Sequence, residues 1–412
     1  MSPNPTQSRT AASILCSCLF TIFLSAWFAV RPNISTPNAS WTRLTLEKSR
    51  VFVWTLLCPE LMLMWALQQW YAGRTIVDLV PGRGWTTVHS HFLQMGGLIL
   101  YKDGRPSQAL CTKRLSKLLE SGAVDPPNVS RTEIQDKSKL SPFLVVLVLL
   151  QVGWFLVQSG ARLANRLPLT ALEFETFMLL VLNGVLLAAW WDKPLDVATP
   201  VRVDLKFEIP REELEEPSEQ DPDFHRPYPS IPDPPLLRLF TSFVVRPVLV
   251  ISIAVVREVV NLFDDDDVLE GSLAVPVYYV SPLTDGGNSA AVFFIISVVF
   301  GMGFHGLHCL LWNSVFPSQA EALLWRVSSI VIAGVPGMVL FIFLVICGLV
   351  IFVSDAIVDA IPTMLWGYGA VLFLWIHAAA RLAILVDAFL SLRSMSPRLL
   401  EEISWTAYIP HF

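Results

Sequence analysis

Several ionisable side chains lie within apolar segments of this chain, where an unpaired charge is costly to bury. His305 and His308 are three residues apart, so they share one face of a helix. His377 and Arg381 are four residues apart and also share a face. Imidazole changes its charge near neutral pH and can bind metals. These residues therefore predict acid/base chemistry inside a membrane helix bundle.

A carboxylate lies in another apolar segment. Glu60 follows Pro59, which removes a helical hydrogen bond and leaves a backbone carbonyl free. We expect Glu60 to pair with Arg381, and the histidines to complete one polar pocket as acid/base groups or metal ligands. The alternative is that each side chain only hydrogen-bonds across helices and stabilises their packing. The candidate catalytic residues are His305, His308, His377, Glu60 and Arg381.

The sequence favours no metal site and identifies no cofactor. Three intramembrane histidines are too few for a histidine-rich di-iron hydroxylase or desaturase. The six cysteines contain no CxxC pair of the kind that binds zinc. Asp192 and Asp196 are spaced to hold Mg²⁺ against a diphosphate, as a membrane prenyltransferase requires. Surface carboxylates at a helix boundary are the simpler interpretation of that pair.

Two further groups are candidates for ligand binding. Gln151 and Gln158 are one heptad apart in an apolar run, with Trp154 on the same side. His89 and His91 are two residues apart, so they would be neighbours on a strand but not on a helix. We expect the segment with these histidines to fold back over the mouth of the bundle.

The composition shows what kind of structure must position these residues. The chain has 412 residues, of which 53% are hydrophobic and 16% charged, with a formal net charge of −6. An ordinary soluble chain has about 25% charged residues. This balance excludes a disordered chain, a typical soluble enzyme and a nucleic-acid partner. The lipid bilayer is the expected partner, with a lipophilic small molecule as a further candidate.

Seven apolar runs are long enough to cross a bilayer, which takes about 20 residues each. The predicted spans are 11–30, 51–71, 142–160, 174–191, 290–312, 327–353 and 364–386. The first is long and uncharged, which favours an uncleaved span over a signal peptide. The predicted fold is an all-α polytopic bundle with an N-terminal membrane half, 1–191, and a C-terminal half with a short tail, 290–412.

Polar segments separate these spans. Segment 72–141 is mixed in charge and is expected to be structured. Segment 192–238 is acidic and proline-rich, which is typical of a semi-extended linker. Segment 239–289 is expected to hold an interfacial helix, 239–263, followed by an acidic loop. A crossing helix at 239–263 is the alternative.

Lys and Arg in short loops predict the orientation of the bundle. With seven spans and an outside N-terminus, nine such residues lie in short inside segments and one lies outside. The two large loops are then non-cytoplasmic, and the sequon at Asn128 is predicted to be glycosylated. The sequons at Asn33 and Asn38 would be cytoplasmic and unmodified.

Several sequence blocks together carry a resemblance that runs over nearly the whole chain. They include Cys18-Leu19-Phe20-Thr21-Ile22-Phe23, Pro59-Glu60-Leu61, Gln151-Val152-Gly153-Trp154, Trp190-Trp191-Asp192-Lys193-Pro194-Leu195-Asp196 and Tyr408-Ile409-Pro410-His411. The chain resembles a group of uncharacterised multi-pass membrane proteins of filamentous fungi. The resemblance implies a fungal source and a multi-pass fold, and it implies no activity.

Two classes of function remain open on the sequence. One is a membrane-embedded enzyme that acts on a lipid or isoprenoid, and the other is a carrier or scaffold without catalysis. No Walker A motif and no GxSxG elbow is present, so the sequence predicts neither an ATP-driven pump nor an α/β-hydrolase. The expected location is the endomembrane system or the plasma membrane. Convergence of the intramembrane polar residues would favour an enzyme or a carrier.

Overall fold

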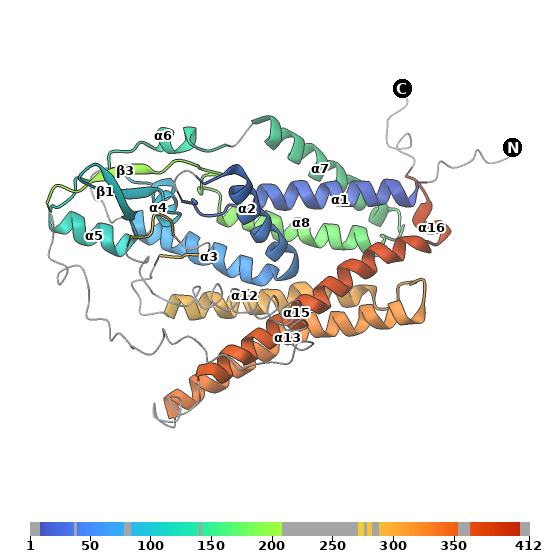
Figure 1. Cartoon of the computed structure of the whole chain (residues 1–412). Helices are drawn as coiled ribbons and strands as arrows, with labels where there is room; N and C mark the ends of the chain where they lie inside the picture. Colours follow the sequence, from blue (N-terminus) through green and yellow to red (C-terminus); the bar gives the residue numbers. More distant parts are fainter. Residues whose placement is uncertain are drawn as a thin grey trace, which may run out of the picture.

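In a computed structural model of the chain, six long apolar helices build most of the molecule. The structure describes residues 9–36, 39–77, 84–139, 142–207, 271–275, 278–281, 288–352 and 363–403. The six helices lie together as one bundle, in which α13 and α15 are tilted against the others (Figure 1). They are α1 (Ala11–Ala29), α7 (Pro142–Ala164), α8 (Ala171–Ala189), α12 (Asn288–Gly306), α13 (Gln319–Phe352) and α15 (Thr363–Leu390). The predicted all-α polytopic membrane fold is confirmed.

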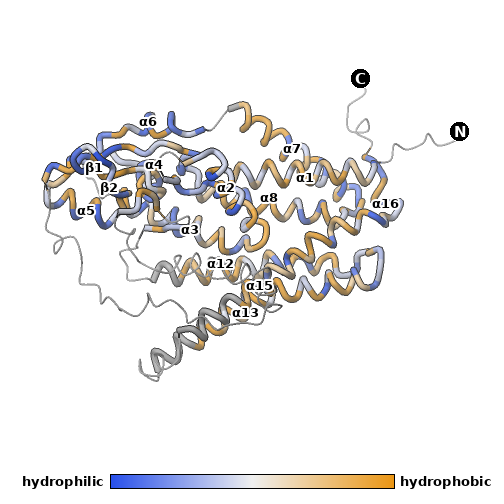
Figure 2. The backbone as a smooth tube through the Cα atoms, viewed as in Figure 1, coloured by the Kyte–Doolittle hydropathy of each residue, from blue (hydrophilic) through white to orange (hydrophobic). Residues whose placement is uncertain are grey.

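The outer faces of these helices are apolar. Phe143, Leu149 and Leu150 on α7 are between 65% and 74% exposed. Figure 2 shows hydrophobic residues along the bundle and hydrophilic ones concentrated at one end. A continuous exposed apolar surface of this kind is stable in lipid and not in water. The protein is therefore an integral membrane protein.

The predicted span 51–71 is two helices in the structure. α2 (Trp41–Leu57) and α3 (Pro59–Ile76) meet at Cys58 with a bend of 115°. Pro59 has no N–H to continue α2, but it suits the first position of a new helix. The bend lies within the bundle, away from its ends (Figure 1). Counting the bent pair as one span would give seven.

The two described ends of the chain meet at one end of the bundle, which we call the tail end. The backbone N–H of Arg9 donates to Leu400 O at 3.1 Å, and its Nε donates to Leu399 O at 2.7 Å. Leu399 and Leu400 lie in α16 (Pro397–Leu400), which follows α15 and the short η5 (Ser391–Arg393). The six spanning helices among the described residues are an even number, which fits a bent pair that returns to the side from which it enters.

A small polar domain, which we call the cap, covers the opposite end. It contains α4 (Thr87–Gln94), α5 (Thr112–Glu120), α6 (Arg131–Asp136) and a sheet of order β2-β1-β3. Strands β1 (Leu98–Lys102) and β2 (Arg105–Ala109) form an antiparallel hairpin, and β3 (Val201–Asp204) pairs in parallel with β1. The hairpin turns at Asp103 and Gly104, which both have positive φ. β3 thus occupies part of the segment that was predicted to be a linker.

Both helices of the bent pair are tied to the cap end. The side chain of Lys48 in α2 donates to Asp196, which follows α8, at 2.6 Å. Near the end of α3, Gln69 O accepts from Gln94 of α4 at 3.1 Å. The backbone of Ile34, before α2, donates to Met95 at 2.8 Å. The pair therefore enters the bundle from the cap and returns to it, as a re-entrant hairpin.

Other expectations lie outside the described residues. These are the interfacial helix 239–263, most of the linker 192–238 and the sequon at Asn38.

Candidate functional site

Six ionisable side chains from five elements meet in the interior of the bundle. We call them the charge cluster, and their side chains are at most 10% exposed. They are Glu60 of α3, Glu175 of α8, His305 of α12, His308 of η4 (Leu307–Leu311), and His377 and Arg381 of α15. All five candidate catalytic residues from the sequence are among them. The structure brings these five together and adds Glu175.

Glu175 is paired with two cluster residues. Its Oε2 lies 3.0 Å from Arg381 Nη2, and its Oε1 lies 2.5 Å from His308 Nε2. None of the three side chains is exposed. A buried carboxylate requires such partners because its desolvation is not repaid otherwise. The predicted pairing of Arg381 with Glu60 is therefore replaced by a pairing with Glu175.

His308 lies between a guanidinium group and a carboxylate. Its Nδ1 lies 2.8 Å from His305 O, and because a carbonyl only accepts, Nδ1 carries a proton. Its Nε2 lies 2.8 Å from Arg381 Nη1, a donor, and 2.5 Å from Glu175 Oε1, an acceptor. The ring can accept a hydrogen bond from Arg381, whereas its contact with Glu175 is a close approach of an ion pair without hydrogen-bond geometry.

Glu60 lies between two other histidines. Its Oε2 is 3.2 Å from His305 Nε2, and its Oε1 is 3.0 Å from His377 Nε2. The rings of His305 and His377 are 5.1 Å apart, edge to face. Nδ1 of each ring is buried and has no hydrogen-bond partner among the described residues. The ion-pair partners of Glu60 are thus two histidines, whereas those of Glu175 are a histidine and an arginine.

The bend between α2 and α3 explains why Glu60 and Arg381 lie here. The end of α2 leaves unpaired carbonyls, and Arg381 Nε donates to one of them, Leu56 O, at 3.2 Å. Glu60 lies in the first turn of α3, where the helix dipole favours a negative charge. Each charge is therefore adjacent to the helix end of opposite polarity.

Gly301 permits the close approach of α12 to α3. A Cβ atom at Gly301 would lie 3.0 Å from Glu60 Cβ, whereas one at Gly303 or Gly306 would meet nothing within 4 Å. Only the first of these three glycines is therefore needed for the contact that places His305 beside Glu60.

Cys58 adds a thiol to the Glu60 side of the cluster. Its Sγ, a Glu60 oxygen and a His377 nitrogen all lie within 4.8 Å of one another. Cys58 is fully buried, and it is both the C-cap residue of α2 and the N-cap residue of α3. The sequence, which has no CxxC pair, gave no indication of this position.

The candidate ligand residues of the cap have structural partners. His89 and His91 lie on the helix α4 and not on a strand. His89 Nδ1 accepts from Thr86 N at 3.1 Å, and Nε2 lies 2.9 Å from Val129 O, so His89 joins the start of α4 to the loop before α6. His91 is buried against α3, where burial, together with the charges of Lys193 and Arg31, lowers its pKa to about 3. The two histidines do not form a joint site.

A buried lysine lies where the cap meets the bundle. Lys193 Nζ donates to Asn33 Oδ1 at 3.0 Å and to Gln69 Oε1 at 2.9 Å, and it lies over the ring of Trp190 at 5.0 Å. Burial, with the nearby charge of Arg31, holds the pKa of Lys193 well below its usual value. The neighbouring acid pair is already bonded, because Asp192 accepts from Thr87 at 2.5 Å and Asp196 from Lys48.

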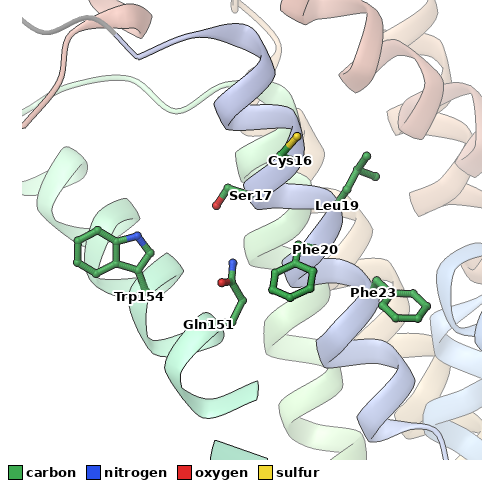
Figure 3. A pocket seen from close by; sticks show the side chains of 7 residues that line it. All are labelled: Cys16, Ser17, Leu19, Phe20, Phe23, Gln151 and Trp154. Carbon is green, nitrogen blue, oxygen red and sulfur yellow. The ribbon is translucent and has the colours of Figure 1, made fainter. Parts of the chain in front are cut away.

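The glutamine and tryptophan candidates line a lipid-facing groove. Gln151 and Trp154 of α7 line a space of about 720 Å³ beside α1, and the side chains of Gln151 and Ser17 point into it (Figure 3). Gln151 Nε2 donates to Thr21 Oγ1 of α1 at 2.8 Å. Gln158 is half-buried on the same helix. The groove is formed by α1 and α7, which contribute no residue to the charge cluster.

Fold and site together define a multi-pass membrane protein with a buried charge cluster at a re-entrant helix hairpin. Residues 73–209 and 293–412 match the model of a family described as a family of unknown function (DUF8562). Since the match covers more than half of the chain, the protein belongs to this family. No curated protein and no solved structure matches the chain. Its function must therefore be argued from the site.

Proposed function

We propose that the protein is a membrane carrier whose charge cluster binds and releases a proton. The observation that carries the proposal is the position of His308 Nε2 between Arg381 Nη1 at 2.8 Å and Glu175 Oε1 at 2.5 Å. Intramembrane ionisable residues of this kind are typical of proton relays in pumps and transporters. A scaffold has no need for a buried histidine between a guanidinium group and a carboxylate.

The re-entrant hairpin supports a carrier over a purely structural bundle. Backbone that is not helical within a membrane is tolerated where it lines a functional site, and broken helices form ion and substrate sites in many transporters. Here the break supplies Leu56 O to Arg381 and positions Glu60 in the first turn of α3. An enzyme acting on a lipid or isoprenoid is less supported, because the lipid-facing groove and the cluster share no residue.

The proposal includes an orientation. With the tail end in the cytosol, the short segments on that side contain Arg9, Arg162, Arg166, Arg326, Arg393 and Arg398. The short segment on the cap side contains Arg31, Arg43, Lys48 and Arg50, so the positive-inside rule favours this orientation by six to four. The cap and Asn128 would then be non-cytoplasmic, in the endomembrane system or at the plasma membrane.

Proton flux in liposomes tests the proposal. The full-length protein is reconstituted with a trapped pH-sensitive dye, a pH gradient is imposed, and potassium with valinomycin compensates the charge. We expect the wild type to dissipate the gradient faster than protein-free liposomes, and Glu175→Gln to lose most of this flux.

Glu173→Gln is the matched control. Glu173 lies two residues away on the same helix and is also buried, but it pairs with Arg9 at the tail end. It should keep the flux. Wild-type flux equal to that of empty liposomes, or an equal loss in both variants, would refute the proposal.

A further inference from the structure

The Glu60 side of the charge cluster has unpaired ligand atoms. His377 is 2% exposed, and both of its ring nitrogens are buried without a hydrogen-bond partner among the described residues. Its Nε2 lies 3.0 Å from Glu60 Oε1 but makes no hydrogen bond to it. Buried polar atoms are nearly always paired, so this arrangement calls for an explanation. A buried imidazole nitrogen without a hydrogen bond, close to a carboxylate and a thiol, is available as a metal ligand.

We infer that Cys58, Glu60 and His377 bind a divalent transition-metal ion, with zinc as the best fit. Their ligand atoms lie within 4.8 Å of one another. Around a tetrahedral zinc with bonds of 2.0–2.3 Å, ligand atoms are separated by about 3.5 Å. Forming the site would therefore require changes in these distances of about 1 Å at most, because the distance between His377 Nε2 and Glu60 Oε1 is already 3.0 Å.

The donor set selects the metal. A thiolate and an imidazole are ligands for zinc and related d-block ions, whereas Mg²⁺ and Ca²⁺ prefer oxygen atoms alone. A thiolate and a carboxylate together carry two negative charges, which a divalent ion balances. This balance matters because a net charge within the membrane is costly.

His305 completes the surroundings without being one of the three ligands. Its Nε2 lies 3.2 Å from Glu60 Oε2 and holds the oxygen that faces away from His377. Groups that orient a metal ligand in this way commonly contribute about 10- to 100-fold in affinity. Three protein ligands leave a fourth position for water or a substrate, as in catalytic or transported metal sites and unlike closed structural ones.

The bend in the re-entrant hairpin positions two of the three ligands. Cys58 and Glu60 lie on either side of Pro59, where α2 ends and α3 begins. His377 reaches them from α15. Metal binding would therefore tie the hairpin to α15. The inference uses neither Glu175 nor His308 as a ligand, so it can fail or hold independently of the proposed proton site.

Cobalt spectroscopy tests the inference. Purified full-length protein in detergent is treated with a chelator, desalted and titrated with Co²⁺. We expect about one ion per chain, a near-ultraviolet thiolate-to-cobalt charge-transfer band, and visible bands of tetrahedral intensity that Zn²⁺ abolishes. Cys58→Ser should lose the charge-transfer band, and His377→Gln should weaken Co²⁺ binding by more than about 10-fold.

Cys18→Ser is the matched control, because Cys18 is also fully buried in a bundle helix, α1, but is not part of the cluster. It should keep the complete spectrum. A charge-transfer band that persists in Cys58→Ser, or a wild type without such a band, would overturn the inference.

A measurement on the unaltered protein removes any dependence on folding of the variants. The extended X-ray absorption fine structure of zinc in the Zn²⁺-loaded wild type should show one sulfur neighbour at about 2.3 Å and nitrogen or oxygen neighbours at about 2.0–2.1 Å. A zinc shell without sulfur would exclude Cys58 as a ligand.

Discussion

At the scale of single residues, the pair of Arg381 and Glu175 has the largest expected effect on stability. Both side chains are fully buried and their charges compensate each other at 3.0 Å. Arg381→Gln leaves Glu175 without its main counter-charge, and breaking such a buried pair costs about 3–5 kcal/mol. We expect a large loss of thermal stability in detergent for this variant.

The double variant Arg381→Gln with Glu175→Gln should recover much of that loss, because no charge is then left unpaired. Arg393→Gln is a suitable control, since Arg393 is 59% exposed in its pair with Glu321. It should change the stability by less than about 1 kcal/mol. A double variant as unstable as the single one would contradict this account.

His91 should make the stability of the protein depend on pH. Burial lowers its pKa in the folded state to about 3, from about 6.5 in an unfolded chain. Between these values the unfolded chain binds a proton that the folded chain does not, so stability is complete above about pH 6.5 and falls as the pH falls toward 3. His91→Gln should flatten this part of the curve, measured as apparent melting temperature between pH 4 and 7. Parallel curves for the two proteins would contradict the assignment.

The sequence predicted which residues meet but not which residues pair. Intramembrane His, Glu and Arg are rare and costly, which is why five of the cluster residues could be found from the sequence. Their pairing depends on which helices are neighbours, and spacing along one helix carries no such information. Glu175 was missed because it lies near the start of its apolar run, where an acid is typical of a helix boundary.

At the scale of elements, the contact between α3 and α12 depends on one glycine. In Gly301→Ala the new methyl group would lie 3.0 Å from Glu60 Cβ, so the two helices must separate. Overpacking of this kind costs about 1–3 kcal/mol. We expect lower thermal stability and weaker proton flux, because His305 would also move away from Glu60.

Gly303→Ala provides the control for that experiment. Its Cβ would meet nothing within 4 Å, and alanine favours a helix by up to about 1 kcal/mol over glycine. This variant should be as stable as the wild type or more so. Equal destabilisation by both substitutions would show that the effect is not specific to the contact with Glu60.

The re-entrant hairpin could not be predicted from hydropathy alone. The mean hydropathy of residues 51–71 shows how apolar the segment is, but it does not show whether the chain crosses the membrane or turns back within it. Pro59 signalled an interruption, but a proline can kink a helix as well as end it. Two tertiary contacts favour the helix end over a kink. Arg381 donates a hydrogen bond to the free carbonyl of Leu56, and Gly301 leaves space for the side chain of Glu60.

At the scale of the whole molecule, the hairpin determines the side on which each loop lies. A crossing at 51–71 would separate the region of Asn33 from the cap. In the structure both belong to the cap end, since Ile34 donates to Met95 of the cap at 2.8 Å. The predicted placement of Asn33 on the side opposite to the cap therefore differs from the structure.

Glycan mapping with tags at both ends of the chain tests this arrangement. In a eukaryotic host we expect a glycan at Asn128, which is exposed, and none at Asn33, whose Oδ1 accepts from Lys193 at 3.0 Å and so is engaged in the fold. Asn128→Gln should remove the mobility shift that a glycosidase removes from the wild type. In sealed microsomes, protease should reach an N-terminal and a C-terminal tag equally, because Arg9 and Leu400 lie side by side. Protection of one tag but not the other would mean an odd number of crossings. Together with a glycan state at Asn33 that differs from that expected for the cap side, it would place Glu60 on a complete span and not at the tip of a re-entrant hairpin.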